Sequence, residues 1–113
     1  MSSSLDGTTI TLTRGDTFRM LVRMYEDDEQ TEEYIPQEGD VIRFATKKKF
    51  KDGEEVIFEE IIPNDTRILT ITPADTKQMA FGKYVYDIQI TYANGDVDTF
   101  VDKGIFIITE EVD

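Results

Sequence analysis

Apolar and polar residues alternate along most of this sequence. In the clearest example, every second position from Tyr84 to Tyr92 is a tyrosine or an isoleucine. Successive side chains of a β-strand point to opposite faces, so this alternation predicts strands with one buried face. An amphipathic helix would instead repeat its apolar positions every three to four residues. We therefore expect a chain built mainly of strands around one shared core.

The alternation predicts about eight short strands separated by turns. The expected strands span residues 9–13, 17–24, 41–47, 55–62, 67–71, 84–92, 97–101 and 105–109. Arg14-Gly15-Asp16 is expected to form either a hairpin turn or a kink in a strand that continues. Asn94-Gly95 favours a tight hairpin because both residues tolerate positive φ. Lys103-Gly104 is expected to bend the chain between the last two strands.

Residues 41–62 are expected to form a β-hairpin with a basic tip. The lysine run 47–49 precedes the turn signal Asp52-Gly53, and an acidic return strand follows it. On that strand we expect Glu59 and Glu60 to face mostly outwards. Opposite charges across such a hairpin stabilise it by roughly 0.2–1 kcal/mol per pair.

One short helix is expected after the fifth strand. The segment Thr72-Pro73-Ala74-Asp75 holds a threonine that can cap a helix, a proline suited to the first position and an aspartate that can reach back. Gly82 is expected to end this helix. Met79 or Phe81 is then expected to pack on the core.

These elements favour one fold class for the 113 residues. About eight short strands and one short helical turn predict an all-β protein, an immunoglobulin-like antiparallel β-sandwich. A small barrel is the alternative. We expect one domain over residues 1–113, with frayed ends at 1–7 and 110–113.

Two tyrosines are candidates for a structural corner. In sandwich domains, a tyrosine hydroxyl can bond back to upstream backbone and so fix a crossover between the sheets. Tyr84 and Tyr86 enter the clearest strand just after the predicted helix, where such a corner belongs. Ordinary core tyrosines would be equally buried but would lack that bond.

The sequence contains no cysteine, histidine or tryptophan. Without cysteine and histidine it lacks thiolate nucleophiles, imidazole bases, disulfides and the usual ligands of zinc, haem and iron–sulfur centres. It also lacks a phosphate-binding glycine loop and a serine nucleophile elbow. We therefore expect a protein that is not an enzyme and uses no cofactor.

Carboxylates are the remaining candidates for chemistry. Asp96, Asp98 and Asp102 could supply the pair that a glycosidase needs, but the first two flank a hairpin turn, where aspartate serves turn geometry. The run Glu26 to Glu29 offers oxygen ligands to calcium but lacks the glycine and the spacing of an EF-hand loop. We prefer the structural interpretation of both sets and expect no catalytic or metal site.

Acidic residues gather in one stretch of the sequence. The chain has 24 acidic and 12 basic residues, and eight of the acidic ones lie between positions 26 and 40, where no basic residue occurs. This stretch is expected to be a loop and the first place to look for a partner contact. The candidate interaction residues are Glu26, Asp27, Asp28, Glu29, Glu32, Glu33 and Tyr34.

Charge and hydropathy limit the partners. The net charge of −12 opposes binding to nucleic acid and to anionic membranes, despite the local lysine run at 47–49. No apolar stretch is long enough to span a bilayer, and Met1 to Asp6 lacks the features of a signal peptide. We expect a protein made in the cytoplasm that binds other proteins rather than nucleic acid or a membrane.

Four segments resemble small β-sandwich proteins of tailed bacteriophages and prophages, in particular the N-terminal domain of the phage baseplate upper protein. They are Ile10–Phe18, Val41–Phe44, Thr72–Thr76 and Gly82–Ile88. The resemblance covers most of residues 8–109. It implies a non-enzymatic, virion-associated component of a tail, baseplate or head fibre that contacts other virion proteins or copies of itself. The acidic stretch and the basic hairpin tip depart from the family pattern, so the family's partner contacts are not transferred.

Two other functions also fit the sequence. An acidic inhibitor that mimics nucleic acid would bind a basic groove on a host protein, and it would need a continuous stripe of carboxylates. A carbohydrate-binding fibre module would need exposed aromatic rings, for which Tyr25, Tyr34 and Tyr92 are the candidates. The arrangement of charge and the exposure of these rings in the folded protein distinguish the three hypotheses.

Overall fold

The computed structural model describes residues 9–25, 32–48, 55–77 and 79–110. Within them the chain forms nine strands and one helix, α1 (Pro73–Thr76). The strands are β1 (Thr9–Thr13), β2 (Phe18–Leu21), β3 (Met24–Tyr25), β4 (Glu33–Tyr34), β5 (Val41–Lys47), β6 (Val56–Ile62), β7 (Ile68–Ile71), β8 (Gly82–Thr91) and β9 (Val97–Thr109). The all-β prediction from the period-two alternation is therefore confirmed, with one short helix as expected.

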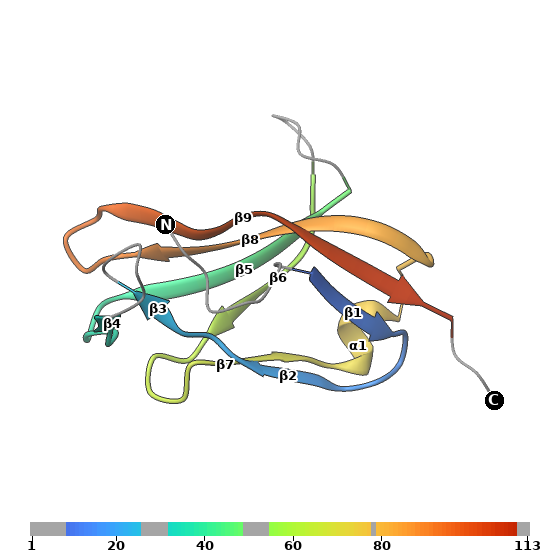
Figure 1. Ribbon diagram of the computed structural model, residues 1–113, viewed down its shortest axis with the longest axis horizontal. Coiled ribbons are helices and arrows are strands. Elements are labelled where there is room, and N and C mark those ends of the chain that lie inside the picture. The colour runs from blue at the N-terminus through green and yellow to red at the C-terminus, as the bar shows by residue number, and fades with distance from the viewer. Residues whose placement is uncertain (1–8, 26–31, 49–54, 78, 111–113) are drawn as a thin grey trace.

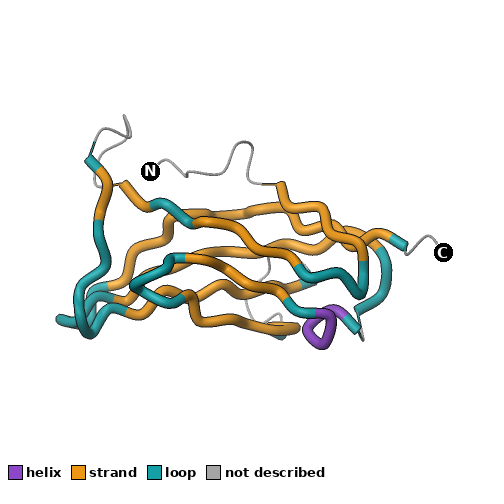
Figure 2. Tube along the Cα trace, turned by 90° about the horizontal axis from the view of Figure 1, so that it is seen from below, coloured by secondary structure: helices purple, strands orange, loops and turns teal. Residues whose placement is uncertain are grey.

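The strands form one large sheet and two small ones. The large sheet has five strands in the order β1-β9-β8-β5-β6, while β2 pairs with β7 and β3 pairs with β4. In Figure 1 the long strands β9, β8 and β5 lie above β2 and β7, so the protein has two layers. Figure 2 shows the same layers from below, with α1 at one end of the molecule.

The first strand departs from a purely antiparallel arrangement. β1 pairs with β9 in parallel, with Thr9 opposite Ile105 and Thr13 opposite Thr109. A parallel pair needs a long connection, and here almost the whole chain connects the two strands. After Gly15, which has a φ of 92°, the chain leaves the large sheet and enters β2 of the other layer. Arg14-Gly15-Asp16 is thus a turn that connects two sheets, so it is neither the expected hairpin turn nor a kink within one continuous strand.

The strand expected over residues 17–24 is interrupted. β2 ends at Leu21, and the next strand residue is Met24 in β3. Its partner β7 begins only at Ile68, because Arg67 has a φ of 56°, outside the range of a strand. After Leu21 the chain therefore no longer pairs with β7, and its next strand, β3, pairs with β4.

Two predicted hairpins are present in the large sheet. β5 and β6 are antiparallel neighbours, although the expected basic tip falls mostly at 49–54, outside the described residues. β8 and β9 are joined through Asn94-Gly95, and Gly95 has a φ of 98°. The Tyr92 N–H donates to the Asp96 carbonyl at 2.7 Å and closes this second hairpin.

The helix begins where the capping pattern predicts. The Asp75 carboxylate accepts a hydrogen bond of 2.8 Å from the Thr72 N–H, the reach-back bond of a capping box. The expected end at Gly82 is wrong, because the helix ends at Thr76 and Gly82 begins β8. The chain leaves the helix early and so brings Met79 into the core, whereas Phe81 stays exposed.

The core lies between the two layers. It combines inner-face residues of the large sheet, such as Phe44 and Ile88, with Leu69 and Ile71 of β7, all fully buried. At its centre the Phe44 ring lies 5.1 Å from the Tyr86 ring and 6.1 Å from the Phe106 ring, measured between centroids. Aromatic pairs at such distances add to the stabilisation from burial alone.

The last two expected strands are one strand. β9 runs without a break from Val97 to Thr109, and the predicted bend at Lys103-Gly104 is replaced by register shifts against β8 between Tyr86 and Gln89. Such bulges place extra residues in one strand and bend it without ending the ladder. The glycine is needed for contact, because a Cβ on Gly104 would lie 2.4 Å from Cε2 of Tyr86.

Replacing Gly104 by alanine should therefore overpack the core. We expect Gly104→Ala to lower the free energy of unfolding by about 1–3 kcal/mol, because the Tyr86 ring or the β9 backbone must move. Urea denaturation of the purified variant measures this loss. In a Tyr86→Leu background the same substitution should cost less, and an equal cost in both backgrounds would contradict the contact as its cause.

Candidate functional site

The structure describes only part of the predicted acidic interaction loop. Glu26, Asp27, Asp28 and Glu29 lie outside the described residues. Of the other candidates, Glu32 is exposed, whereas Glu33 and Tyr34 form β4 and are half-buried. β4 pairs with β3 at one end of the molecule, beside the turn between β8 and β9 in Figure 1.

A carboxylate that the sequence did not single out organises this end. Asp40 is only 7% exposed. Its Oδ2 accepts hydrogen bonds from the Tyr34 hydroxyl at 2.5 Å and the Gln37 N–H at 2.8 Å, and its Oδ1 accepts one from the Ala93 N–H at 3.0 Å. The Asn64 amide also donates to the Asp40 carbonyl at 2.8 Å. One residue thus connects β4 with the turns that precede β5, β7 and β9.

These bonds also change the acidity of Asp40. Hydrogen bonds to a carboxylate favour its charged form. The Tyr34 hydroxyl has the largest effect, and with the Gln37 and Ala93 N–H groups it lowers the pKa of Asp40 below 3.8, against the opposing effect of burial. Asp40 is therefore charged at neutral pH, and its carboxylate accepts three hydrogen bonds from other groups of the protein.

Two aromatic rings at this end also make contacts within the protein. The rings of Tyr34 and Tyr92 meet edge to face at 5.5 Å between centroids. The Tyr92 hydroxyl donates to Oδ2 of Asp98 at 2.8 Å, and both rings pack against the core. Both rings are thus half-buried and held by contacts within the protein, whereas a ring that stacks on a sugar needs an exposed flat face. Tyr25, the third candidate, is half-buried in β3.

The other carboxylates nearby serve turns and ion pairs. The Asp96 N–H donates to Oδ1 of Asn94 at 2.9 Å, as expected for turn geometry. Glu33 forms a partly buried ion pair with Arg67, which holds β4 to the turn before β7. The side chain of Asp102 lies outside the described residues. The turn role expected for Asp96 is thus present, whereas the expectation that Asp96, Asp98 and Asp102 form no catalytic pair stays a prediction.

We call this part of the molecule the acidic end. It comprises the described segments 32–40, 63–67 and 92–96, together with Asp98, whose side chain lies on the opposite side of β9 from that of Val97. Apart from Arg67, all of its charged side chains are acidic: Glu32, Glu33, Glu38, Asp40, Asp65, Asp96 and Asp98. The acidic stretch predicted from the sequence is thus joined in space by acidic residues from two distant turns, Asp65 before β7 and Asp96 before β9.

The bonds of Asp40 predict a specific pH dependence of stability. We expect Asp40→Asn to be less stable than the wild type at pH 7, because an amide cannot accept three hydrogen bonds as a carboxylate does. The pKa of Asp40 is lowered on folding, so its contribution is present above pH 3.8 and is lost as the pH falls through the lower folded-state pKa.

Thermal unfolding at pH 7 and at pH 2–3 measures this effect. The gap in melting temperature between the wild type and Asp40→Asn should narrow at the lower pH. Asp65→Asn is the matched control, because the exposed Asp65 carboxylate accepts only a local bond from the Thr66 N–H within the described residues. Equal losses from both substitutions would contradict the role of Asp40.

A second surface has different chemistry. On β5, β6, β8 and β9, exposed side chains alternate with the buried ones and point away from the core. We call this surface the outer sheet face. Its exposed apolar and charged members are Val41, Ile57, Glu59, Ile61, Lys83 and Val97. Arg43, Lys47, Asp87, Ile105 and Ile107 lie on the same side and are half-buried, and Ala45 and Val85 are buried there. Here apolar side chains are interspersed with charges of both signs, whereas the acidic end carries mainly one sign.

The register brings these residues together from distant parts of the chain. Arg43 lies between Ile61 of β6 and Gln89 of β8, and Val41 and Val97 both lie beside Thr91. Nε of Arg43 donates to Oε2 of Glu59 at 2.5 Å, so the expected attraction across this hairpin is present. Sequence periodicity alone could not identify this surface, because it depends on the order of four strands.

One glutamate of β6 faces the opposite way from the prediction. Glu60 was expected outside, yet it shares the inner side of β6 with Phe58 and Ile62 and lies opposite Phe44. Partial burial, followed by a hydrogen bond and repulsion from Asp75 of α1, raises the pKa of Glu60 to about 7. Two adjacent glutamates in a strand must face opposite sides, and the apolar Phe58 and Ile62, two positions on either side of Glu60, were the signal that it is the inner one.

Glu60 should make the protein less stable as the pH rises. Its pKa is 4.5 without these effects and about 7 in the folded protein, so between these values the folded state binds more protons than the unfolded state. Stability therefore falls as the pH rises through 7. We expect Glu60→Gln to raise the melting temperature at pH 8 and to change it little at pH 5.

Melting curves from pH 5 to pH 8 test this expectation. The control is Glu59→Gln, which removes the neighbouring outward-facing carboxylate and its Arg43 ion pair. That variant should keep the slope of the wild type. The assignment to Glu60 is wrong if Glu60→Gln retains the wild-type slope.

Tyr84 and Tyr86 differ in their contacts. The Tyr84 hydroxyl donates to the Ala80 carbonyl at 2.7 Å, a bond back to the chain that leads from α1 into β8. Tyr86 is buried against Phe44 and Gly104, and this burial raises the pKa of its hydroxyl. Of the two candidates, Tyr84 therefore has the bond of a structural corner, whereas the ring of Tyr86 fills the core.

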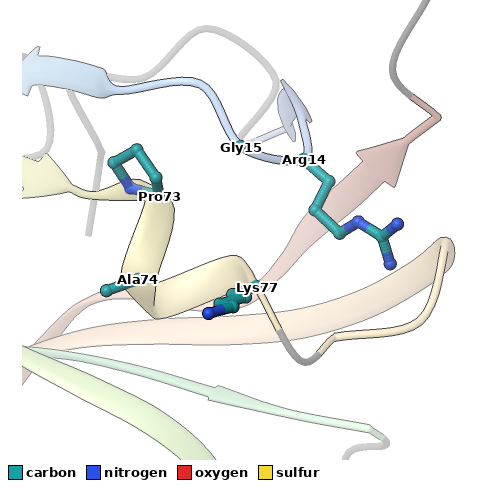
Figure 3. Close-up of a pocket in the computed structure, with 5 residues that line it drawn as sticks. All are labelled: Arg14, Gly15, Pro73, Ala74 and Lys77. Atoms are coloured by element: carbon teal, nitrogen blue, oxygen red, sulfur yellow. The ribbon is translucent and has the colours of Figure 1, made fainter.

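A pocket beside α1 has a volume of about 450 Å³. It is lined by Arg14, Gly15, Pro73, Ala74 and Lys77. Figure 3 shows that the Arg14 side chain points away from Pro73. Its guanidinium lies 4.3 Å from the centre of the Phe81 ring, so the arginine is used in a cation–π contact. The pocket thus has few polar groups that converge on a ligand.

Among the described residues, no three or more histidine, cysteine, aspartate or glutamate side chains lie close enough to hold a metal ion. The helix that the structure describes is too short to cross a membrane.

Comparisons with known proteins give no match. No protein-family model matches this chain, and no curated protein matches it.

Proposed function

We propose that this chain is a non-enzymatic, virion-associated structural or accessory protein of a phage or prophage, of the tail, baseplate or head-fibre type. It acts through protein–protein contacts and is made in the cytoplasm of the bacterial host. The proposal starts from the resemblance of four sequence segments to phage β-sandwich proteins. The observation that carries it is the outer sheet face, where exposed aliphatic side chains surround charges of both signs.

The exposed aliphatic residues support a contact surface. Val41, Ile57, Ile61 and Val97 are large hydrophobic residues with 41–58% of their surface exposed. Single exposed apolar residues are common on proteins, but a group on one flat face is typical of protein interaction sites. The β6 strand lies at the edge of the sheet, where a partner strand could extend it.

The fold that we propose within the all-β class is immunoglobulin-like. The large sheet and the β2–β7 sheet enclose one core, and α1 connects β7 of the small sheet to β8 of the large one. Tyr84, near the start of β8, bonds back across this connection as in a tyrosine corner. Domains of this type commonly serve as rigid modules that present surfaces to partners.

The two alternative functions have weaker support. A nucleic-acid mimic needs a continuous acidic stripe, but basic and acidic side chains alternate on the outer sheet face. A carbohydrate-binding module needs free aromatic rings, but Tyr34 and Tyr92 contact each other and bond Asp40 and Asp98. Protein binding remains the function that the surface supports best.

Capture from purified virions tests the proposed function. The full chain is immobilised and incubated with dissociated virions of a phage that carries this sequence, and bound proteins are identified by mass spectrometry. We expect a tail, baseplate or head protein to be retained. An immunoblot should also find the chain itself in intact particles. A chain that is absent from particles and retains no virion protein would overturn the proposal.

A further inference from the structure

We infer that a second copy of this chain docks on the outer sheet face, so that the protein forms a face-to-face homodimer. The inference deepens the proposed function by naming the partner of one surface. It depends on the position of the exposed apolar residues, the local balance of charge and the size of the face.

The exposed apolar residues form the margins of the face. Ile61 and Val97 are 58% and 54% exposed, the two highest values among the exposed large hydrophobic residues of the described chain. They lie on β6 and β9, on either side of β5 and β8. Between them lies Ala45 of β5, which is only 3% exposed and so does not project from the face. A flat partner can therefore contact both margins at the same time.

Charge favours this face over the rest of the molecule for self-association. Two copies with a net charge of −12 each repel one another, and most strongly where the acidic ends approach. On the outer sheet face the described charged side chains are basic at Arg43, Lys47 and Lys83 and acidic at Glu59 and Asp87. The face is thus close to neutral, so two copies repel one another less there than through their acidic ends.

The face is large enough for a modest dimer. Four strands about 4.8 Å apart, with seven residues at about 3.3 Å each, cover roughly 450 Å² of flat sheet. Protruding side chains increase the accessible area towards the roughly 800 Å² per partner of a standard interface. We therefore expect a dimer at the weak end of the stable range, with a dissociation constant in the micromolar range.

The opposite layer offers a smaller alternative surface. On β2 and β7 the outward pair Leu21 and Ile68 is also exposed, but these strands have only four residues each and form a two-stranded sheet. This pair provides a control, because Leu21 and Ile68 are also exposed aliphatic residues, at 43% and 36%, but lie on the opposite layer. A charge can thus be placed on either layer without disturbing a buried residue.

Sedimentation velocity of the full chain tests the inference. From about 1 to 500 µM, the wild type should shift from the 13.0 kDa monomer to twice that mass. The variant Ile61→Glu/Val97→Glu should weaken dimerisation at least tenfold, because each substitution adds an unpaired negative charge to the interface. Leu21→Glu should leave the dissociation constant unchanged, and circular dichroism should show that all variants are folded.

Two results would overturn the inference. One is a wild type that remains monomeric at 500 µM. The other is a dimer that Ile61→Glu/Val97→Glu leaves intact or that Leu21→Glu disrupts. The virion capture experiment separates these failures from failure of the proposed function: a monomer that still retains a virion protein ends the homodimer but not the proposed function.

Discussion

The contact between the Tyr86 ring and the backbone of Gly104 is the constraint on which the large sheet depends. A side chain at position 104 would overlap the ring, so β9 can pass β8 only with a glycine there. The same ring contacts Phe44 of β5, which in turn contacts Phe106 of β9. Three neighbouring strands thus close around one aromatic group. The register shifts beside it adjust β9 so that both of its halves stay in the ladder.

The sequence was sufficient to predict the elements that depend on local chemistry. The period-two alternation indicated strands such as β8, and the order of threonine, proline and aspartate indicated the start of α1. Both signals act within about ten residues. The parallel pairing of β1 with β9 could not be predicted in this way, because its partners are nearly 100 residues apart and no local pattern encodes strand direction.

The surfaces were harder to predict than the strands. Asp40 is one of eight acidic residues in a stretch of similar composition, and only its hydrogen bonds to Tyr34, Gln37 and Ala93 distinguish it. The outer sheet face required the order of four strands, because its residues come from distant parts of the chain. The resulting molecule has one acidic end, where the Asp40 carboxylate is hydrogen-bonded within the protein, and one nearly neutral face with exposed apolar residues. These surfaces suit different kinds of neighbour.

The parallel pairing of β1 and β9 has a mechanical consequence. Thr9 at the start of β1 and Thr109 at the end of β9 lie at opposite ends of the ladder that joins these two strands. A pulling force applied between these two points acts along the strands, in shear. All the hydrogen bonds of the ladder then bear the load together, whereas in an unzipping geometry they would break one after another. The domain is therefore arranged to resist tension along its chain.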